Sequence, residues 1–179
     1  KNKTIKTVLI TTSTLSSSKI FENYKFKKTV HQFFPIDLKY FTLRFLEYWQ
    51  PTIAIFIDSE IWPSMFREIK KKSVPLILMN ARITKKSFNK WKFFKSFSRN
   101  TFGKIDIAYP SNIETFYYLK KLEINKIKKI GNLKFTDSKN SNKRLLSKSF
   151  VLSLKKRLIW VASSTHPSEE ALVGKAHFH

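Results

Sequence analysis

The chain contains no cysteine, few acidic residues and no long apolar run. The absence of cysteine excludes disulfide bonds and thiolate metal sites. No apolar run approaches the ~20 residues that a membrane-spanning helix needs, so the sequence predicts no such helix. Hydrophobic residues still make up 42% of the 179 residues, which predicts a sizeable core and argues against wholesale disorder. The length suits one domain, or one domain and part of a second.

Acidic residues are heavily outnumbered, because 12 Asp and Glu stand against 35 Lys and Arg, a formal net charge of +23. This balance favours polyanionic partners: nucleic acid, anionic lipid or phosphorylated substrates. The abundance of Lys, Asn, Ile and Phe is also what AT-rich codons produce, so drift in composition is an alternative source of the charge. The chain has no Arg-rich tail and no Gly-rich RNA-binding signature, and we therefore do not expect nucleic acid as a partner.

Short apolar runs alternate with longer amphipathic stretches along the chain. The predicted strands are residues 7–12, 30–34, 52–57, 75–79, 105–109, 128–130 and 158–162. The predicted helices are residues 37–48, 65–72, 84–102, 113–122 and 145–154, with Asp37 as the N-cap of the first. This alternation predicts an α/β fold in which helices flank a Rossmann-like parallel sheet.

A polar stretch at residues 136–142 contains no long apolar side chain and is typical of a linker. We therefore expect residues 1–138 to form one domain and residues 139–179 to form the linker and the start of another. The chain opens on Lys1 and stops within a helical pattern at residues 171–179, so we also expect a piece of a longer protein.

The turn Asp58-Ser59-Glu60-Ile61-Trp62-Pro63 follows the clearest predicted strand. In open parallel sheets, ligands bind at the carboxyl ends of the strands. The carboxylates of Asp58 and Glu60 could orient a sugar hydroxyl or assist proton transfer. The alternative is a helix N-terminus, where the helix dipole favours acidic residues and Pro63 suits the first turn.

Asn80-Ala81-Arg82 follows the next predicted strand, and therefore lies at the same edge of the sheet. Arg82 could bind a phosphate or carboxylate with two parallel hydrogen bonds. It could equally pair with Asp58 or Glu60 and hold the loop, and the residues alone leave both readings open. The segment Gly131-Asn132-Leu133-Lys134-Phe135 closes the first unit, with Gly131 suited to tight backbone.

The segment Ser163-Ser164-Thr165-His166-Pro167-Ser168-Glu169-Glu170 follows the last predicted strand and leads into a helix. Hydroxyls and free backbone N–H groups at a helix N-terminus bind phosphate readily. The alternative is a Ser- and Thr-rich N-cap without a ligand. No second histidine stands at metal-binding spacing from His166, so the sequence predicts no metal site.

Four motifs, taken in order, resemble those of the 3-deoxy-D-manno-octulosonic acid (Kdo) transferase family. They are D-S-E-I-W-P, N-A-R-I-T, G-N-L-K-F and S-S-T-H-P-S-E-E, and their spacings agree as well. The resemblance implies a GT-B architecture, in which two Rossmann-like domains flank a cleft. It implies that residues 1–138 form most of the acceptor-side domain and that residues 139–179 begin the donor-side domain.

The same resemblance implies a glycosyltransferase that moves Kdo from CMP-Kdo to a phosphorylated lipid A precursor in lipopolysaccharide biosynthesis. The implied location is the cytoplasmic face of the bacterial inner membrane, whose anionic surface is a further expected partner. No cofactor is expected. The main catalytic base is implied to be a glutamate upstream of Lys1, so we expect this chain to be inactive alone.

The resemblance also implies roles for individual residues. The catalytic candidates are Asp58 and Glu60; the acceptor-binding or loop-organising candidates are Asn80, Arg82 and Lys134; the donor-binding candidates are Ser164, Thr165, His166 and Glu169. This sequence departs from the family pattern in three places. Asp58 replaces a functional glutamate, Thr136 an aspartate and Ser168 a glycine.

The predicted helix at residues 84–102 is both basic and aromatic. Its residues include Lys85, Lys86, Lys90, Lys92 and Lys95, interleaved with Phe88, Trp91, Phe93 and Phe94. Such a helix could lie on an anionic membrane, or it could be a packed helix with solvated lysines. Two other functions are considered: another GT-B nucleotide-sugar glycosyltransferase, or a basic module that binds nucleic acid or anionic membrane without catalysis.

Overall fold

The computed structural model describes residues 5–24, 26–133, 148–155, 161–163, 165–166 and 168–177. The chain divides into two compact units, Lys1–Ser138 and Lys139–His179. Within the described residues, no helix is long and apolar enough to cross a membrane.

The first unit begins with a parallel pair of strands. The elements are β1 (Val8–Thr12), α1 (Leu15–Glu22) and β2 (Thr29–Phe33). The register runs from the pair Val8–Thr29 to the pair Thr12–Phe33. Helix α1 begins where the hydroxyl of Thr14 accepts the N–H of Ser17, so the Thr-rich end of β1 serves as a helix cap.

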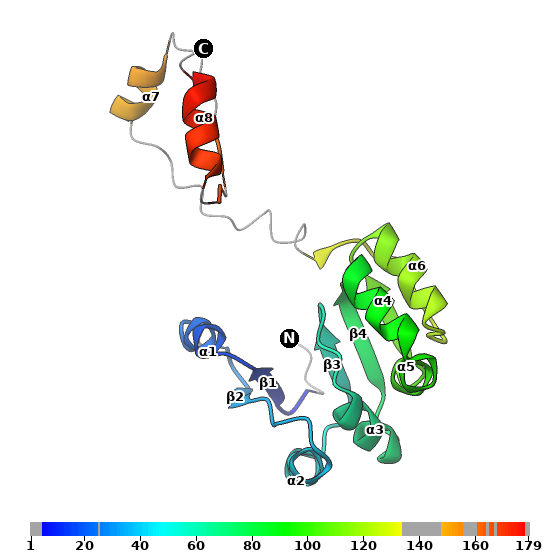
Figure 1. Ribbon diagram of the computed structural model, residues 1–179. Helices are drawn as coiled ribbons and strands as arrows, with labels where there is room; N and C mark the ends of the chain where they lie inside the picture. Colours follow the sequence, from blue (N-terminus) through cyan, green and yellow to red (C-terminus); the bar gives the residue numbers. More distant parts are fainter. Residues whose placement is uncertain are drawn as a thin grey trace. The chain divides into compact units, whose positions relative to one another are not determined.

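A second sheet, with strand order β3-β4-β5, holds the core of this unit (Figure 1). The remaining elements are α2 (Lys39–Trp49), β3 (Ala54–Ile57), α3 (Pro63–Lys71), β4 (Leu76–Ala81), α4 (Lys85–Phe93), α5 (Lys95–Phe102), β5 (Ile107–Pro110) and α6 (Ile113–Lys121). All of the strand pairs among the described residues are parallel and helices connect the strands, which confirms the predicted α/β fold with a parallel sheet.

Strand β4 lies between β3 and β5 and carries the most buried side chains of the sheet. Leu76 and Leu78 are at most 1% exposed and belong to one cluster with Phe66 of α3, Phe102 of α5 and Leu119 of α6. The rows of apolar residues that the sequence offers on each helix are therefore buried against this central strand. The carboxyl ends of β3 and β4 are held rigidly as a consequence.

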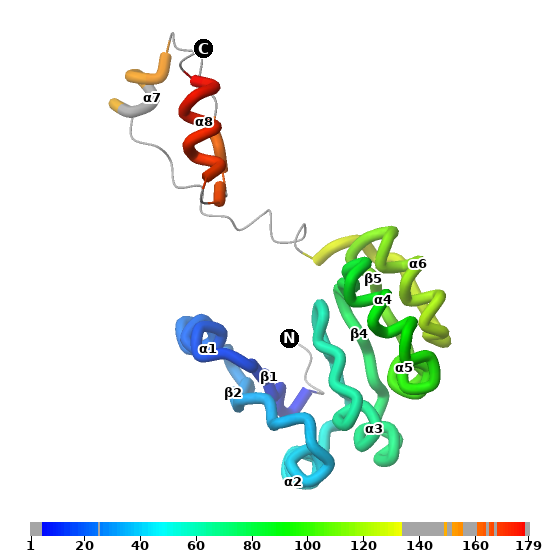
Figure 2. The backbone as a smooth tube through the Cα atoms, viewed as in Figure 1, coloured from blue at the N-terminus to red at the C-terminus, as the bar shows by residue number. Residues whose placement is uncertain are grey.

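Three predicted elements differ in the structure. The predicted helix at residues 84–102 is two helices, because the backbone leaves helical geometry at Phe94 (φ −97°, ψ 64°) and the chain changes direction there (Figure 2). The predicted strand at residues 128–130 is reduced to a single bridge between Ala108 and Ile127. The N-cap of α2 is Leu38, which makes no side-chain capping bond, so the prediction that Asp37 caps this helix is wrong.

Asp37 caps a different helix. Its Oδ2 accepts the N–H of Ser64 at 3.1 Å and its Oδ1 accepts the N–H of Met65 at 2.7 Å, both in the first turn of α3. The carboxylate satisfies N–H groups that have no partner within the helix, and its charge opposes the positive end of the helix dipole. One side chain thereby fixes the start of α2 against the start of α3.

The second unit contains helices α7 (Lys148–Leu154) and α8 (Glu169–His177). Helix α7 accounts for the described end of the predicted helix at residues 145–154. Residues 158–160, which make up most of the last predicted strand, lie outside the described residues, and residues 161–163 have no regular structure.

Candidate active site

The turn after β3 is bound to β4 and to the turn that follows β4 by three hydrogen bonds. The N–H of Asp58 donates to the carbonyl of Met79 at 3.0 Å, and the N–H of Arg82 donates to the carbonyl of Asp58 at 3.2 Å. The hydroxyl of Ser59 donates to the carbonyl of Arg82 at 2.8 Å. The structure therefore brings the two turns together at the carboxyl edge of the sheet, where parallel α/β sheets bind ligands.

Asp58 has a left-handed backbone conformation, with a φ of 64°. Such a conformation costs a residue with a side chain roughly 1–2 kcal/mol, and Asp and Asn tolerate it better than most. The bonds to Met79 and Arg82 hold the backbone in this state. Asp58 is half-buried, so its carboxylate keeps a path to solvent and to a ligand.

Glu60 is exposed, and its Oε2 accepts the indole N–H of Trp62 at 2.7 Å. Trp62 in turn packs against Phe34, with ring centroids 4.9 Å apart. The hydrogen bond orients the carboxylate of Glu60, and no further hydrogen bond occupies its second oxygen among the residues that the structure describes.

Neither acidic residue of this turn caps the helix that follows. The N-cap of α3 is Trp62, its first turn contains no acidic residue, and Asp37 accepts the N–H groups there. The alternative reading of Asp58 and Glu60 as N-terminal helix caps is therefore wrong.

Asn80 is 6% exposed within β4 and also has a left-handed backbone, with a φ of 51°. Its Oδ1 accepts the N–H of Leu133 at 3.2 Å. The amide thus ties the segment that begins with Gly131 to the end of β4. Gly131 has a φ of 86°, which favours glycine because a Cβ crowds the backbone there.

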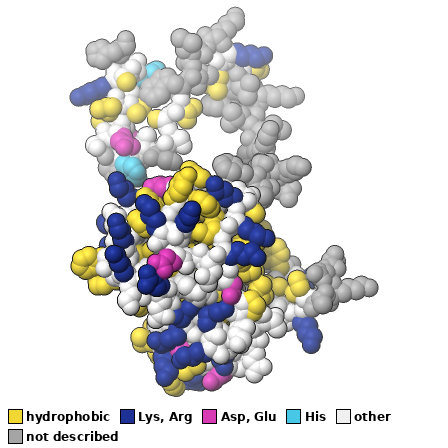
Figure 3. Space-filling model, turned by 90° about the vertical axis from the view of Figure 1, so that its right-hand side faces the viewer, with side chains coloured by type: hydrophobic (Ala, Val, Ile, Leu, Met, Phe, Trp, Pro, Cys, Tyr) yellow, Lys and Arg dark blue, Asp and Glu magenta, His cyan; other side chains and the backbone are white. Residues whose placement is uncertain are grey.

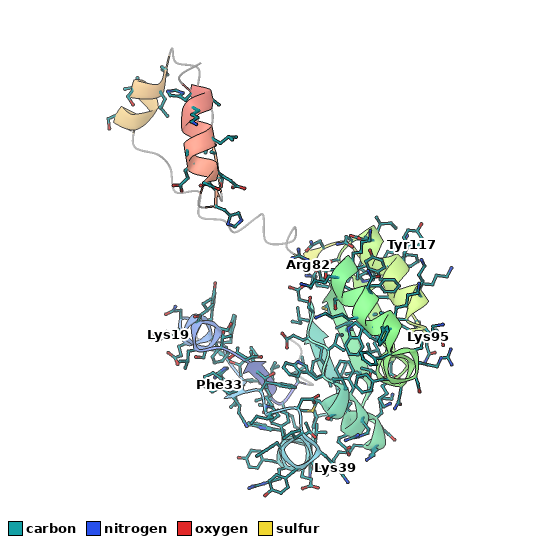
Figure 4. The ribbon with its side chains drawn as sticks, viewed as in Figure 1. Lys19, Phe33, Lys39, Arg82, Lys95 and Tyr117 are labelled. Atoms are coloured by element: carbon teal, nitrogen blue, oxygen red, sulfur yellow. The ribbon has the colours of Figure 1, made fainter. Side chains whose placement is uncertain are left out.

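Arg82 lies exposed at the same edge (Figure 4). Within the described part of the chain, no ion pair joins it to Asp58 or Glu60. The sequence left two interpretations of Arg82 open: binding of an anionic ligand, or an ion pair with Asp58 or Glu60. The described residues do not form that ion pair. Lys134, which follows Leu133, lies outside the described residues.

Two carboxylates with shifted pKa values, Glu68 and Asp106, lie on α3 and before β5. Burial raises the pKa of Glu68, but hydrogen bonds from Arg67 and Lys71 outweigh it, so the pKa lies below its ordinary value. Burial likewise raises the pKa of Asp106, and bonds from Lys70 Nζ and the N–H of Leu76 lower it by more. These charges stabilise the fold and take no part in the edge formed by the two turns.

In the second unit, the described part of the Thr-His motif is organised by the two acidic residues at its end. Glu169 Oε2 accepts the N–H of His166 at 2.9 Å, and the N–H of Glu169 donates to the carbonyl of His166 at 3.0 Å. The hydroxyl of Thr165 donates to Glu170 Oε1 at 3.2 Å. The carboxylate of Glu169 is thus used to fix the loop, in the manner of a capping box.

Ser164 and Pro167 lie outside the described residues. Ser168, which stands where the family pattern has glycine, has a φ of 84°. That value lies in the region that favours glycine, so the serine keeps the loop shape at a cost of roughly 1–2 kcal/mol.

Two surface pockets lie away from Asp58 and Arg82. One, of about 200 Å³, is lined by residues that include Asp37, Arg67 and Lys104. The other, of about 360 Å³, lies between α4, α5 and the end of α6. Its basic and aromatic lining residues are Phe88, Trp91, Lys92, Lys95, Arg99 and Lys121. Neither of these two pockets contains Asp58 or Arg82.

The sequence reasoning missed one polar contact near the end of the first strand pair. Thr12 Oγ1, at the carboxyl end of β1, and His31 Nε2, in the middle of β2, are 2.9 Å apart. The Phe21 ring stacks on His31 at 5.2 Å.

Comparison with known proteins identifies a matching family and several relatives. The family described as 3-deoxy-D-manno-octulosonic-acid transferase (kdotransferase) matches residues 1–137. The chain is 39% identical over 170 residues to the 3-deoxy-D-manno-octulosonic acid transferase of Rickettsia prowazekii, an alignment that covers 92% of this chain and 36% of that protein. It is 30% identical over 156 residues to the protein of the same name from Haemophilus influenzae, covering 82% of this chain and 35% of that protein.

A more distant relative comes from a plant. The chain is 28% identical over 178 residues to the probable mitochondrial 3-deoxy-D-manno-octulosonic acid transferase of Arabidopsis thaliana, covering 96% of this chain and 40% of that protein. The chain thus spans between 35% and 40% of the length of these three relatives. Because the family matches most of its residues, the chain belongs to the Kdo transferase family of glycosyltransferases.

Proposed function

We propose that the protein containing this chain transfers Kdo from CMP-Kdo to a phosphorylated lipid A precursor in lipopolysaccharide biosynthesis. Membership of the family supports the reaction class. The observation that carries the proposal is the pair of turns at the carboxyl edge, where Asp58 and Arg82 are joined through their backbones. Residues 1–138 would belong to the acceptor-side domain, and residues 139–179 would begin the donor-side domain.

The turn after β3 supplies the carboxylates for the transfer. A sugar hydroxyl that attacks the anomeric carbon must lose its proton, and a positioned carboxylate can accept or orient it. Asp58 and Glu60 are the candidates in this chain, alongside a main base expected upstream of Lys1. Asp58 caps no helix and forms no ion pair among the described residues, which leaves its charge available.

The turn after β4 supplies the anion-binding group. Arg82 presents an exposed guanidinium that suits a phosphate or carboxylate of the acceptor. Asn80 positions this turn, because its side chain holds the segment that leads to Lys134, a second candidate cation. Arg82 is thus the proposed binding residue, and Asn80 is the proposed positioning residue.

The loop before α8 supplies the donor contacts. Ser164, Thr165 and His166 are the candidates for the CMP phosphate, because N–H groups and hydroxyls at a helix N-terminus bind phosphate. Such groups also stabilise the charge of the departing CMP. Glu169 acts indirectly, since its carboxylate holds the backbone of His166.

The reaction is proposed to take place at the cytoplasmic face of the inner membrane, with the anionic membrane surface as a partner. Exposed aromatic side chains at the junction of α4 and α5 support a membrane contact: Phe93 is 80% exposed, Phe94 61% and Phe97 51%. Lysine and arginine side chains surround apolar ones over one face of the first unit (Figure 3). We call Phe93, Phe94 and Phe97, together with Lys92 and Lys95, the aromatic–basic surface.

The test uses the full-length protein with CMP-Kdo and a lipid A precursor. We expect Asp58→Asn to lower kcat by about 100-fold or more, which is typical for loss of an acid–base group, with an unchanged melting temperature. Asp58→Glu, which restores the residue of the family pattern, should keep activity. Glu47→Gln, an exposed position on α2, is the matched control. Normal turnover in Asp58→Asn would remove Asp58 from the site.

Donor competition separates this function from that of another GT-B nucleotide-sugar enzyme. We expect CMP to compete with the donor and UDP not to compete, because the proposed donor carries CMP. Competition by UDP alone would favour the alternative enzyme.

A further inference from the structure

The pocket of about 360 Å³ between α4, α5 and the end of α6 has a cationic rim. Four cations and one acidic residue line it: Lys92 on α4, Lys95 and Arg99 on α5, Lys121 on α6, and Glu123 just beyond α6. All five side chains are exposed. Four positive charges against one negative charge leave an excess of positive charge around a single hollow, which attracts an anion.

The acidic residue neutralises one of these cations. The carboxylate of Glu123 accepts Nε of Arg99 at 2.7 Å and Nη2 of Arg99 at 2.8 Å. Within the part of the chain that the structure describes, Lys92, Lys95 and Lys121 form no ion pair. Like charges gathered at one hollow repel one another, and an anion bound between them relieves that repulsion.

A buried hydroxyl lines the same pocket. Ser98 is 3% exposed, and its Oγ forms no hydrogen bond with another described residue, although its N–H donates to the carbonyl of Phe94. In the described part of the chain, no fully buried side-chain oxygen lacks a partner. The Ser98 hydroxyl therefore reaches the surface, and the hollow that Ser98 lines is this pocket. A hydroxyl in such a position can donate to an oxygen of an anion.

The remaining lining of the pocket is apolar. Phe88 is 7% exposed and stacks on Tyr118, with ring centroids 4.4 Å apart, and Leu122 is 4% exposed. Trp91 stacks on Phe97, with ring centroids 5.9 Å apart. The pocket therefore borders the aromatic–basic surface, which includes Phe97 and shares two lysines with the pocket. Figure 3 views the first unit from the side of α4, α5 and α6, where cations surround apolar side chains.

This combination indicates a ligand that carries both a phosphate and an apolar chain. Pockets for small molecules measure about 300–1,000 Å³, so one of about 360 Å³ suits a small head group. We propose that the pocket binds the phosphate of an anionic glycerophospholipid, whose acyl chains lie against the exposed rings of the aromatic–basic surface. The phosphate accepts hydrogen bonds from the Ser98 hydroxyl and from the ammonium groups of Lys95 and Lys121.

Nucleic acid is the competing polyanion. Its binding needs a track of cations along successive phosphates, whereas the cations here surround one hollow that suits a single phosphate. A membrane surface presents single phosphates directly above an apolar layer, which matches the cationic rim beside exposed phenylalanine rings. The observations therefore favour the lipid, and DNA becomes one arm of the test.

The inference takes the membrane partner from the proposed function and names the lipid group that holds the protein there. The pocket contains neither Asp58 nor Arg82. Figure 4 shows Lys95 of the pocket and Arg82 of the carboxyl edge at separate places on the first unit. The bound phospholipid is therefore an anchor, and not the acceptor that meets Asp58 and Arg82.

The test measures co-sedimentation of the full-length protein with vesicles of phosphatidylcholine and phosphatidylglycerol. We expect Lys95→Ala with Lys121→Ala to weaken binding by about tenfold or more, because both ammonium groups contact the phosphate. The control, Lys19→Ala with Lys39→Ala, removes the same charge from exposed positions on α1 and α2. It should weaken binding by less than about threefold, because it changes only the long-range attraction, which salt screens.

A second variant tests recognition of the phosphate without any change of charge. Ser98→Ala should weaken binding to the same vesicles by about threefold or more, because one hydrogen bond to the phosphate is lost. Its melting temperature should stay unchanged, because the hydroxyl has no described protein partner to lose. Ser96→Ala, at an exposed position on the same helix that does not line the pocket, is the control and should bind as the parent does.

Three results would overturn the proposal. Equal losses in the two lysine pairs, or unchanged binding in Ser98→Ala, would show that charge alone holds the protein on the vesicles. Displacement from the vesicles by inorganic phosphate, at the phosphate concentration of the lipid, would assign the pocket to a soluble ligand. Loss of DNA binding in both pocket variants, with vesicle binding retained, would assign it to nucleic acid.

The pocket and the proposed transfer can fail separately. Transfer of Kdo by the parent protein is measured with the acceptor dispersed in detergent and without vesicles. Absence of transfer would count against the proposed function, while the vesicle experiments would still decide whether the pocket binds lipid. Normal transfer together with equal losses in the two lysine pairs would reject the lipid pocket alone.

Discussion

Asp37 connects two helices through one carboxylate. It precedes α2 in the chain, but both of its oxygens accept N–H groups in the first turn of α3, across separations of 27 and 28 residues. Its position holds α3, and with it the turn that contains Asp58, against the preceding part of the fold. A residue outside the candidate site thus determines where the site residues lie.

Asp37→Ala should lower the free energy of unfolding by about 1–2 kcal/mol, because two N–H groups lose their acceptor at the end of the dipole. Chemical denaturation measures this. Asp37→Asn retains an oxygen that accepts one of the bonds and should lose less. An alanine variant as stable as the parent would show that water replaces the carboxylate at no cost.

Glu68 predicts a pH dependence of stability. Its side chain is 1% exposed and is bound by Arg67 and Lys71, which lower its pKa from the ordinary value of 4.5 despite the opposing effect of burial. A carboxyl group whose pKa is lower in the folded state binds its proton first in the unfolded state. Its stabilising contribution is therefore present above about pH 4.5 and is lost as the pH falls through the folded pKa.

Glu68→Gln should lower stability near neutral pH by about 1–3 kcal/mol, because the charged hydrogen bonds are lost. It should also make stability fall less steeply as the pH is lowered, although Asp106, whose pKa is also lowered, continues to contribute. Melting temperatures measured from about pH 7 to about pH 3 test both effects. A variant with the parent's acid dependence would show that Glu68 is not the group responsible. Glu47→Gln, an exposed position on α2, is the control.

At the scale of elements, the sequence pattern did not predict the junction between α4 and α5. Residues 84–102 have continuous helical spacing, yet the backbone turns at Phe94. Packing explains the turn. The ring centroid of Trp91 lies 5.1 Å from that of the buried Phe102 and 5.9 Å from that of Phe97. Folding α5 back along α4 buries Phe102 and leaves Phe93 and Phe94 at the exposed tip.

If this tip contacts the membrane, the double substitution Phe93→Ser with Phe94→Ser should weaken binding to anionic vesicles by about tenfold or more, because apolar burial provides part of the affinity. Co-sedimentation with vesicles measures the change. Tyr48→Ser removes an aromatic side chain that is 79% exposed on α2 and serves as the control. Unchanged binding of the double variant would exclude the aromatic–basic surface as the membrane contact.

At the scale of the whole molecule, the net charge of +23 also fits the alternative function, a basic module that binds nucleic acid. Purely electrostatic binding to DNA weakens steeply as salt rises, because counterions are released. Binding to a membrane through both apolar and basic groups depends less on salt.

We therefore expect the protein to stay bound to anionic vesicles at physiological salt while its binding to DNA largely disappears. Titrations of salt against both partners provide the measurement. Comparable binding to DNA and vesicles across the series would favour the binding module without catalysis. Loss of both at the same salt would show that the charge alone is responsible.

The sequence by itself determined the alternation of strands and helices, because buried strands and amphipathic helices leave distinct periods in the pattern of apolar residues. It also determined the order of the four motifs and with it the family, which the comparison confirms. The order of the elements was enough to place the turns of Asp58 and Arg82 at one edge, since parallel strands all end on the same side.

Only the tertiary structure decided which partners the polar side chains have. Asp37 reaches a helix 27 residues away, and Asn80 accepts a bond from Leu133, 53 residues away. No local pattern specifies such contacts, because they depend on how the helices and strands pack once each has formed. The same holds for the turn at Phe94, which the burial of Phe102 imposes on a stretch whose own residues favour one continuous helix.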